Sequence, residues 1–158
     1  MPTPTYMPIA NITLSSSASS ITLSSIPATY RDLIVIIDGT ALVSTNVTIA
    51  FNSDTTGANY SSLSMRGNGT TASSITETTS RYIGAIYSTS SNLVVNVMDY
   101  SAADKHKSAL SRQNTAASLV AAWALRWANT SAITSITFGG PQGNFATGTT
   151  LSLYGIAS

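Results

Sequence analysis

Apolar and polar residues alternate along most of this chain, and such alternation is the pattern of strands whose two faces meet different surroundings. It is clearest near the C-terminus, where residues 133–138 and 151–156 each alternate on either side of the turn-rich segment GGPQGN. The second of these segments carries large apolar residues at Leu151, Leu153, Tyr154 and Ile156. We therefore expect the chain to end on a strand that closes a sheet.

Segments of the same kind recur upstream, with turn signals between them. They cover residues 12–14, 21–23, 33–37, 47–51, 60–65, 82–87, 93–98 and 107–114. The uninterrupted apolar run 33–37 predicts a strand buried on both faces, and the largely polar segment 107–114 predicts a strand near a sheet edge. Together the segments predict an all-β domain of about eight to ten strands, folded as a sandwich or a barrel.

Residues 115–128 fit two different elements. Their alanines favour a helix, and Leu119, Trp123 and Trp127 lie at helical spacing. As a strand, the same segment places Leu119, Ala121, Trp123, Leu125 and Trp127 on one face. The surrounding β pattern and the lack of other helical segments favour the strand.

A chain of 158 residues suits one domain, which we expect to span residues 12–158. Prolines at positions 2, 4 and 8 predict an extended N-terminal arm over residues 1–11, with a frayed terminus as the alternative. The first ten residues lack the basic and apolar regions of a signal peptide, so we expect no leader. The longest apolar runs are too short to cross a bilayer, so we expect no membrane partner.

The composition narrows the classes of function. Charged residues make up 8% of the chain, against about 25% in ordinary domains. The sequence has no basic stripe that could bind phosphate groups, so we expect no nucleic-acid partner. The absence of cysteine excludes disulfides and zinc–thiolate sites. Serine and threonine are abundant, and the 43% hydrophobic content argues against disorder. A rigid sheet surface coated with hydroxyl groups is typical of extracellular and virion proteins.

Three blocks of the sequence carry a resemblance to a known family. They are ITLSSIPATYRDL at residues 21–33, FNSDT at 51–55 followed by Asn59-Tyr60, and ITSI at 133–136 followed by LYGI at 153–156. In this order and spacing the blocks resemble the jelly-roll virion structural proteins of tailed bacteriophages, especially marine phages and cyanophages. The resemblance implies a jelly-roll-like antiparallel β-sandwich in a virion, often as a homotrimer.

The resemblance leaves two roles open and carries no catalytic residues. The compact chain favours a capsid decoration (cement) protein that binds the major capsid protein from outside. The alternative is a tail-fibre or spike module that recognises a host surface glycan. We expect a location in the virion after synthesis in the host cytoplasm.

The candidate chemistry is sparse. The one histidine, His106, lies between lysines in a predicted loop, the acids are scattered, and no nucleophile elbow is present. We therefore expect no enzyme, no catalytic residue and no cofactor. The glycine-rich segment 139–143 lacks the Lys-Ser/Thr of a phosphate loop, so we expect a hairpin loop there.

Two sets of side chains could bind a ligand. Asn52, Asp54 and Asn59 could offer oxygen atoms to Ca²⁺, but these residue types also simply form turns, so we predict no metal site. The aromatic residues Tyr100, Trp123 and Trp127 could form a platform for a sugar ring, and core packing is the reading we favour for them.

Overall fold

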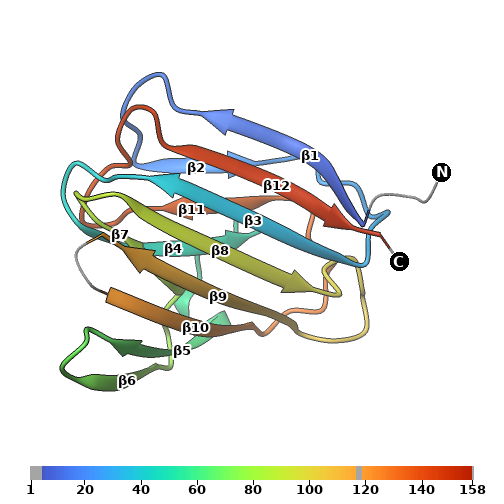
Figure 1. Cartoon of the computed structure of the whole chain (residues 1–158). Helices are drawn as coiled ribbons and strands as arrows, with labels where there is room; N and C mark the ends of the chain where they lie inside the picture. The colour runs from blue at the N-terminus through green and yellow to red at the C-terminus, as the bar shows by residue number, and fades with distance from the viewer. Residues whose placement is uncertain (1–4, 117–118, 158) are drawn as a thin grey trace.

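The computed structural model describes residues 5–116 and 119–157, which form two antiparallel β-sheets (Figure 1). The strands are β1 (Tyr6–Thr13), β2 (Ser20–Leu23), β3 (Asp32–Gly39), β4 (Thr45–Phe51), β5 (Tyr60–Gly67), β6 (Ala72–Glu77), β7 (Tyr82–Ile86), β8 (Ser91–Met98), β9 (Lys107–Thr115), β10 (Leu119–Trp127), β11 (Ile136–Gly139) and β12 (Thr150–Ile156). A single turn of 3-10 helix, η1 (Gly57–Asn59), precedes β5. The predicted all-β sandwich is thus confirmed.

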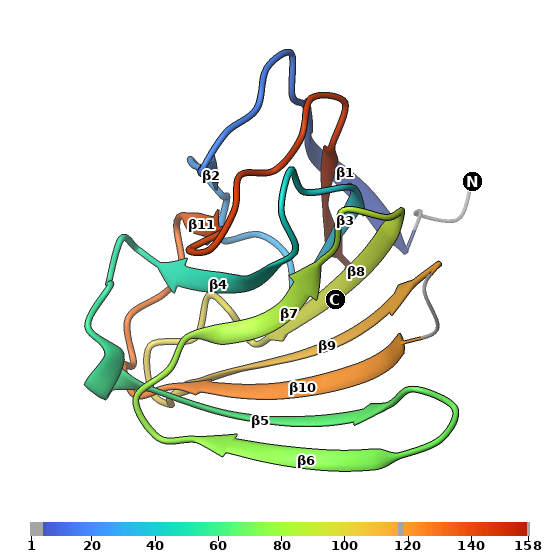
Figure 2. The same cartoon turned by 90° about the vertical axis from the view of Figure 1, so that its left-hand side faces the viewer.

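The two sheets differ in size and lie one over the other. The larger sheet has the strand order β1-β12-β3-β8-β9-β10-β5-β6, and the smaller has the order β2-β11-β4-β7. Figure 2 shows the smaller sheet above one face of the larger, which twists strongly from β1 to β6. The face of each sheet that points to the other sheet is called its inner face, and the opposite face its outer face.

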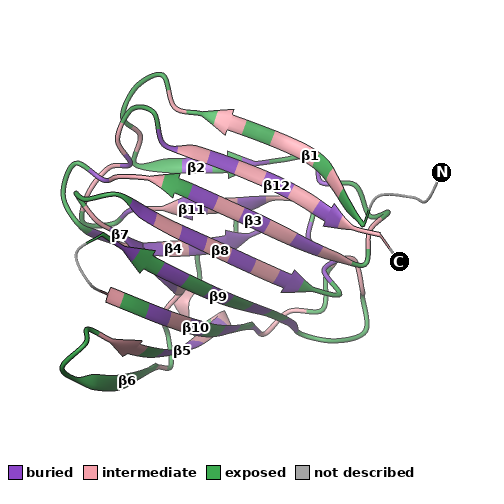
Figure 3. Cartoon of the chain, in the orientation of Figure 1, coloured by how far each residue is buried: buried purple, intermediate pink, exposed green. Residues whose placement is uncertain are grey.

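The core lies between the inner faces. Buried and less buried residues alternate along β3, β8 and β12, as Figure 3 shows. Leu33, Val35 and Ile37 of β3 are fully buried, whereas Ile34 and Ile36 are only half-buried. The prediction that 33–37 is buried on both faces is therefore wrong, because no second layer covers the outer face of the larger sheet within the described part of the chain.

The N-terminal segment is a strand of the larger sheet. Tyr6–Thr13 pairs with β12 across a register shift between Pro8 and Ala10, so an arm that extends to residue 11 is wrong. Residues 1–4 of the predicted arm lie outside the described residues. The strand β12 lies between β1 and β3, which confirms that the C-terminal strand closes a sheet.

The polar strand β9 lies inside the larger sheet, between β8 and β10, so the prediction of an edge position is wrong. Its buried polar side chains reach across to β7 of the smaller sheet. The Ser111 hydroxyl donates to the Ile83 carbonyl, and the Gln113 side-chain carbonyl accepts from the Ala85 N–H. Because these partners satisfy the buried polar groups, a polar strand can occupy the centre of a sheet.

The ambiguous segment 115–128 contains the strand β10, which confirms the prediction of a strand. Its inner face carries Ala121, Trp123, Leu125 and Trp127, all of which are buried. The edge strand β6 was not predicted from the sequence, because ASSITE shows almost no apolar alternation. Among the described residues, no helix is long or apolar enough to cross a membrane.

Candidate interaction surface

The solitary histidine lies beside an exposed ion pair. His106 is exposed in the loop before β9. Beside it, the Lys105 Nζ lies 3.1 Å from a carboxylate oxygen of Asp99, in an exposed ion pair. Over residues 5–116 and 119–157, no group of three or more His, Asp or Glu side chains could hold a metal ion.

The three candidate calcium ligands instead fasten loops together. Asn52 accepts hydrogen bonds from the Thr134 and Ser135 N–H groups at 2.8 and 3.2 Å. The carboxylate of Asp54 accepts from Trp127 Nε1 and from the Asn59 amide, both at 2.8 Å. These oxygen atoms point at donors, so they serve as turn and corner contacts.

The same corner shifts two pKa values. Burial alone would raise the pKa of Asp54, but the hydrogen bonds from Trp127 and Asn59 outweigh it and lower that pKa below its usual range. Burial raises the pKa of Tyr60 to about 12. The Tyr60 hydroxyl donates to the Asp54 carbonyl and accepts from the Phe51 N–H, both at 3.0 Å. This network joins β4, β5 and β10.

The aromatic residues do not form a sugar platform. Tyr100 and Trp127 are almost completely buried, and Trp123 is 7% exposed. The Trp127 ring centroid lies 5.5 Å from that of Phe51 and 6.3 Å from that of Tyr60. The hypothesis of an exposed aromatic platform is therefore wrong, and the alternative of core packing is confirmed.

A buried lysine was missed at the sequence level. Lys107 is 1% exposed, and its Nζ donates to the carbonyls of Ala102, Lys105 and Thr130 at 2.6, 2.9 and 3.0 Å. Burial lowers the pKa of Lys107. The ammonium group ties the loop before β9 to the loop after β10, which is a structural role. The signal was available, because Lys107 occupies an inward position of the β9 alternation.

The largest candidate surface is the outer face of the larger sheet. Cross-strand pairing places the following residues on it: Ile34, Ile36, Val94, Met98, Leu110, Arg112, Val120, Ala122, Ala124, Arg126, Leu63, Met65 and Tyr154. Several large apolar members are strongly exposed, such as Val120 at 67%, Met65 at 59% and Leu110 at 48%. Exposed apolar side chains that gather on one face of a sheet make that face the candidate contact surface of this chain.

Two shallow troughs run along β10 on this face. Ala122 lies in a trough of about 720 Å³, and Ala124 in one of about 350 Å³. The troughs exist because alanine side chains are short and larger side chains rise on both neighbours, namely Leu63 and Met65 on β5 and Leu110 and Arg112 on β9.

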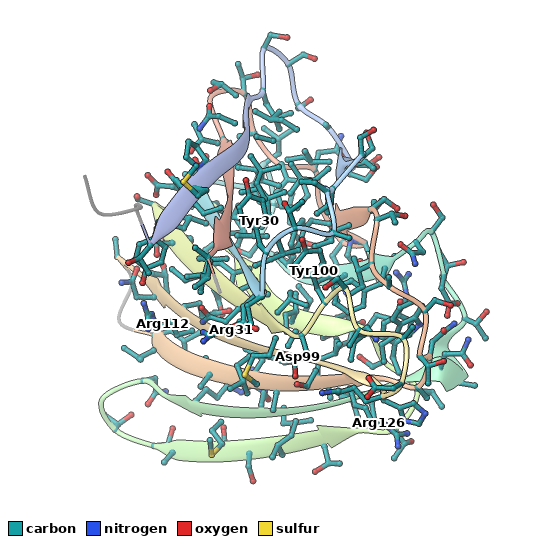
Figure 4. The ribbon with its side chains drawn as sticks, turned by 90° about the vertical axis from the view of Figure 1, so that its right-hand side faces the viewer. Tyr30, Arg31, Asp99, Tyr100, Arg112 and Arg126 are labelled. Atoms are coloured by element: carbon teal, nitrogen blue, oxygen red, sulfur yellow. The ribbon has the colours of Figure 1, made fainter. Side chains whose placement is uncertain are left out.

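Charges on the outer face are separated. Arg112 and Arg126 lie on β9 and β10, whereas Asp32 and Asp38 lie on β3. The Arg31 Nε lies 2.7 Å from an Asp32 carboxylate oxygen, whereas Asp38 is not in either of the ion pairs found among the described residues. Figure 4 shows the arginines at the surface, while Tyr30 and Tyr100 lie between the sheets.

A third trough lies on the outer face of the smaller sheet. Its lining includes Ser20, Thr48, Thr137 and Arg81, and its volume is about 320 Å³. The hydroxyl groups of Thr22 and Thr137 lie 2.9 Å apart across β2 and β11. This hydroxyl coat agrees with the serine and threonine content of the sequence.

Comparisons with known proteins show only distant similarity. No protein-family model matches the chain, and no curated protein matches it. Among solved structures, the exo-inulinase from Aspergillus awamori is 14% identical with a TM-score of 0.44, over 96% of this chain and 29% of the enzyme. This chain thus spans less than a third of the enzyme's length.

Two other solved structures are a second enzyme and a viral coat protein. An alginate lyase from Aplysia kurodai is 8% identical with a TM-score of 0.34, over 92% of this chain and 79% of the lyase. The Tobacco streak virus coat protein dimer is 7% identical with a TM-score of 0.26, over 100% of this chain and 90% of the coat protein. The similarity is thus weak and divided between sugar-active enzymes and a viral coat protein, and it carries no argument about function.

Proposed function

We propose that this chain is a structural protein of a bacteriophage virion and that it decorates the outside of the capsid as a cement protein. The observation that carries the proposal is the outer face of the larger sheet, where Met65, Leu110 and Val120 lie exposed on a framework of paired strands. A rigid apolar face of this kind favours protein–protein contact. Stabilisation through contact needs no catalytic residue, because binding to the assembled state is sufficient.

The proposal includes the partners that the sequence resemblance implies. They are the major capsid protein and further copies of the same chain, with a homotrimer as the implied form. The low charge of the surface supports self-association, because copies with a net charge near +1 repel one another weakly. The location that follows is the exterior of the virion.

A tail-fibre or spike module that recognises a host surface glycan is the second candidate. The trough on the outer face of the smaller sheet favours it, since the hydroxyl groups and the Arg81 side chain in its lining offer hydrogen bonds to a sugar. The burial of Trp123 and Trp127 counts against it, because neither ring is free to stack on a sugar.

The copy number in purified virions tests the proposal. Mass spectrometry with isotope-labelled peptides would give the ratio of this chain to the major capsid protein. A decoration protein is expected in hundreds of copies per particle, and a fibre module in tens or fewer. Absence of the chain from virions purified from the phage that encodes it would contradict both roles.

A further inference from the structure

The outer face of the larger sheet is complementary to itself. We infer that a second copy of this chain docks on it, related to the first by a two-fold axis that runs along the strands between β8 and β9. This contact uses the face that carries the proposed function, and it predicts a two-fold pair where the sequence resemblance implies a homotrimer.

Strand order and twist both permit this arrangement. The strands β8 and β9 are the central pair of the eight, so a half-turn about an axis between them places β3 over β10 and β12 over β5 of the other copy. A twisted sheet has the shape of a saddle, and a half-turn about an axis along its central strands carries a saddle onto itself. Two such sheets can therefore stack with aligned strands.

The half-turn also brings complementary shapes together. Cross-strand pairing places Ala124 in one row with Leu110, Asn96 and Ile34. The next row contains Ala122, Arg112, Val94 and Ile36. Each alanine of one copy thus faces an isoleucine of the other, so that the large β3 side chains enter the troughs along β10.

The same half-turn brings opposite charges of the two copies near one another. The half-turn places Arg112 one row and one strand away from Asp38 of the other copy, within reach of a long arginine side chain. Both partners are exposed and lie outside the ion pairs found among the described residues, so the contact would form twice without breaking an existing one. Arg126 falls opposite Asp32, which Arg31 already contacts, so this second contact contributes less.

The surface is large enough for a stable pair. Strand spacings of about 4.8 Å and a rise of about 3.4 Å per residue give the outer face a footprint of roughly 34 by 20 Å. This is about 700 Å² per copy, close to the ~800 Å² per partner that stable interfaces bury. A two-fold pair uses the same surface on both copies, which is the commonest form of homo-oligomer.

Light scattering coupled to size exclusion, over a series of loading concentrations, measures the assembly directly. We expect a mass of twice 16.4 kDa for the wild-type chain. The variant Leu110→Arg places a charge beside the axis and should give a monomer with an unchanged circular dichroism spectrum. The matched control Ser20→Arg lies at an exposed strand position of the smaller sheet and should remain a dimer.

A charge exchange tests the orientation of the two copies. Arg112→Asp and Asp38→Arg should each raise the dissociation constant of the dimer about tenfold. The double variant restores the contact with reversed signs and should return the constant to within about threefold of the wild type. Additive losses in the double variant would contradict the two-fold pairing.

The remaining outcomes are equally decisive. A wild-type monomer at every concentration, or a dimer that survives Leu110→Arg, would overturn the inference. A trimer would also overturn it but would leave the virion role untouched. A high copy number in virions with a monomeric chain in solution would separate the two proposals, because it would support decoration and contradict self-docking.

Discussion

The two halves of the larger sheet bury their inner faces differently. In the half formed by β12, β3 and β8, most inner positions are aliphatic, as at Leu33 and Leu93, and most outer positions are half-buried. In β5 of the other half, the inner positions hold Ser62 and Ser64, while Leu63 and Met65 point outward. Leu63 and Met65 point away from the core and therefore add little to the fold of one copy. Their exposure agrees with the proposed contact with another molecule.

The inner serines of β5 lower the stability of the single copy. The hydroxyls of Ser62 and Ser64 and the Nε1 of Trp123 are buried without a hydrogen-bond partner. An unsatisfied buried group of this kind costs about 1–3 kcal/mol. All three unsatisfied groups lie on β5 and β10, the strands that carry much of the proposed contact surface.

Loss of the strand β12 should have the largest effect. Deletion of residues 150–158 removes Leu151 and Leu153, whose burial contributes roughly 1.5–3 kcal/mol each. It also leaves β1 and β3 without their shared partner. We expect no soluble folded protein, measured by expression and circular dichroism. A soluble truncated chain with the wild-type melting temperature would show that the aliphatic half does not carry the fold.

Alanine substitutions of one leucine on each face should differ in their effect on the free energy of unfolding. Leu93→Ala on the inner face should lower the free energy of unfolding by about 2–5 kcal/mol, because it leaves a cavity. Leu110→Ala on the outer face should change it by less than about 0.5 kcal/mol under dilute, monomeric conditions. Urea unfolding of both variants measures the difference. Equal losses would place Leu110 in the core of the single copy.

Alkaline pH should weaken the β4–β5–β10 corner through Tyr60. Its pKa is about 12 in the folded chain and near 10.0 when unfolded, so the unfolded state loses its proton first. The stability that Tyr60 contributes is complete below pH 10 and is lost as the pH rises toward 12.

The variant Tyr60→Phe tests this pH dependence. It should lose about 1–2 kcal/mol at neutral pH, because the Phe51 N–H and the Asp54 carbonyl lose their partner. The difference between wild type and variant should shrink between pH 10 and 12 in unfolding measurements. A constant difference would mean that Tyr60 titrates normally in the folded chain.

Two buried serines should respond in opposite directions, although the effect is small. Ser64→Ala removes a hydroxyl without a partner and should stabilise the chain by up to about 1 kcal/mol. Ser111→Ala removes the donor to the Ile83 carbonyl and should destabilise it by about 1–2 kcal/mol. Thermal unfolding compares the two. Destabilisation by Ser64→Ala would show that this hydroxyl has a partner in solution.

The sequence predicted the elements that alternate strongly and missed those whose role depends on distant partners. The strands β8 and β12 follow from the alternation of their apolar residues, and β3 follows from an uninterrupted apolar run. The central place of β9 depends on hydrogen bonds with β7, in which Ser111 donates and Gln113 accepts, and local polarity does not reveal them. The edge strand β6 is held by pairing with β5 rather than by its own pattern.

The contact surface was hidden from the sequence for a similar reason. Alternation shows that Leu63 and Met65 share one face of a strand, but it does not say which face lies inside. Only the pairing of β5 with β10 places these residues beside Ala122 and Ala124 and outside the core. The sequence favoured a buried Trp127, but it could not show that Asp54 accepts from Nε1, because Asp54 is far away along the chain.

The most direct test of the account is the oxidation of methionine by dilute hydrogen peroxide, read by mass spectrometry of the native protein. Met65 and Met98 lie on the outer face and are 59% and 43% exposed in the single copy, whereas Met7 lies on β1 and serves as the internal reference. If the outer face is covered by another copy, both should oxidise several-fold more slowly in the wild type than in Leu110→Arg, relative to Met7. Equal relative rates in the two proteins would contradict the claim that this face is a contact surface.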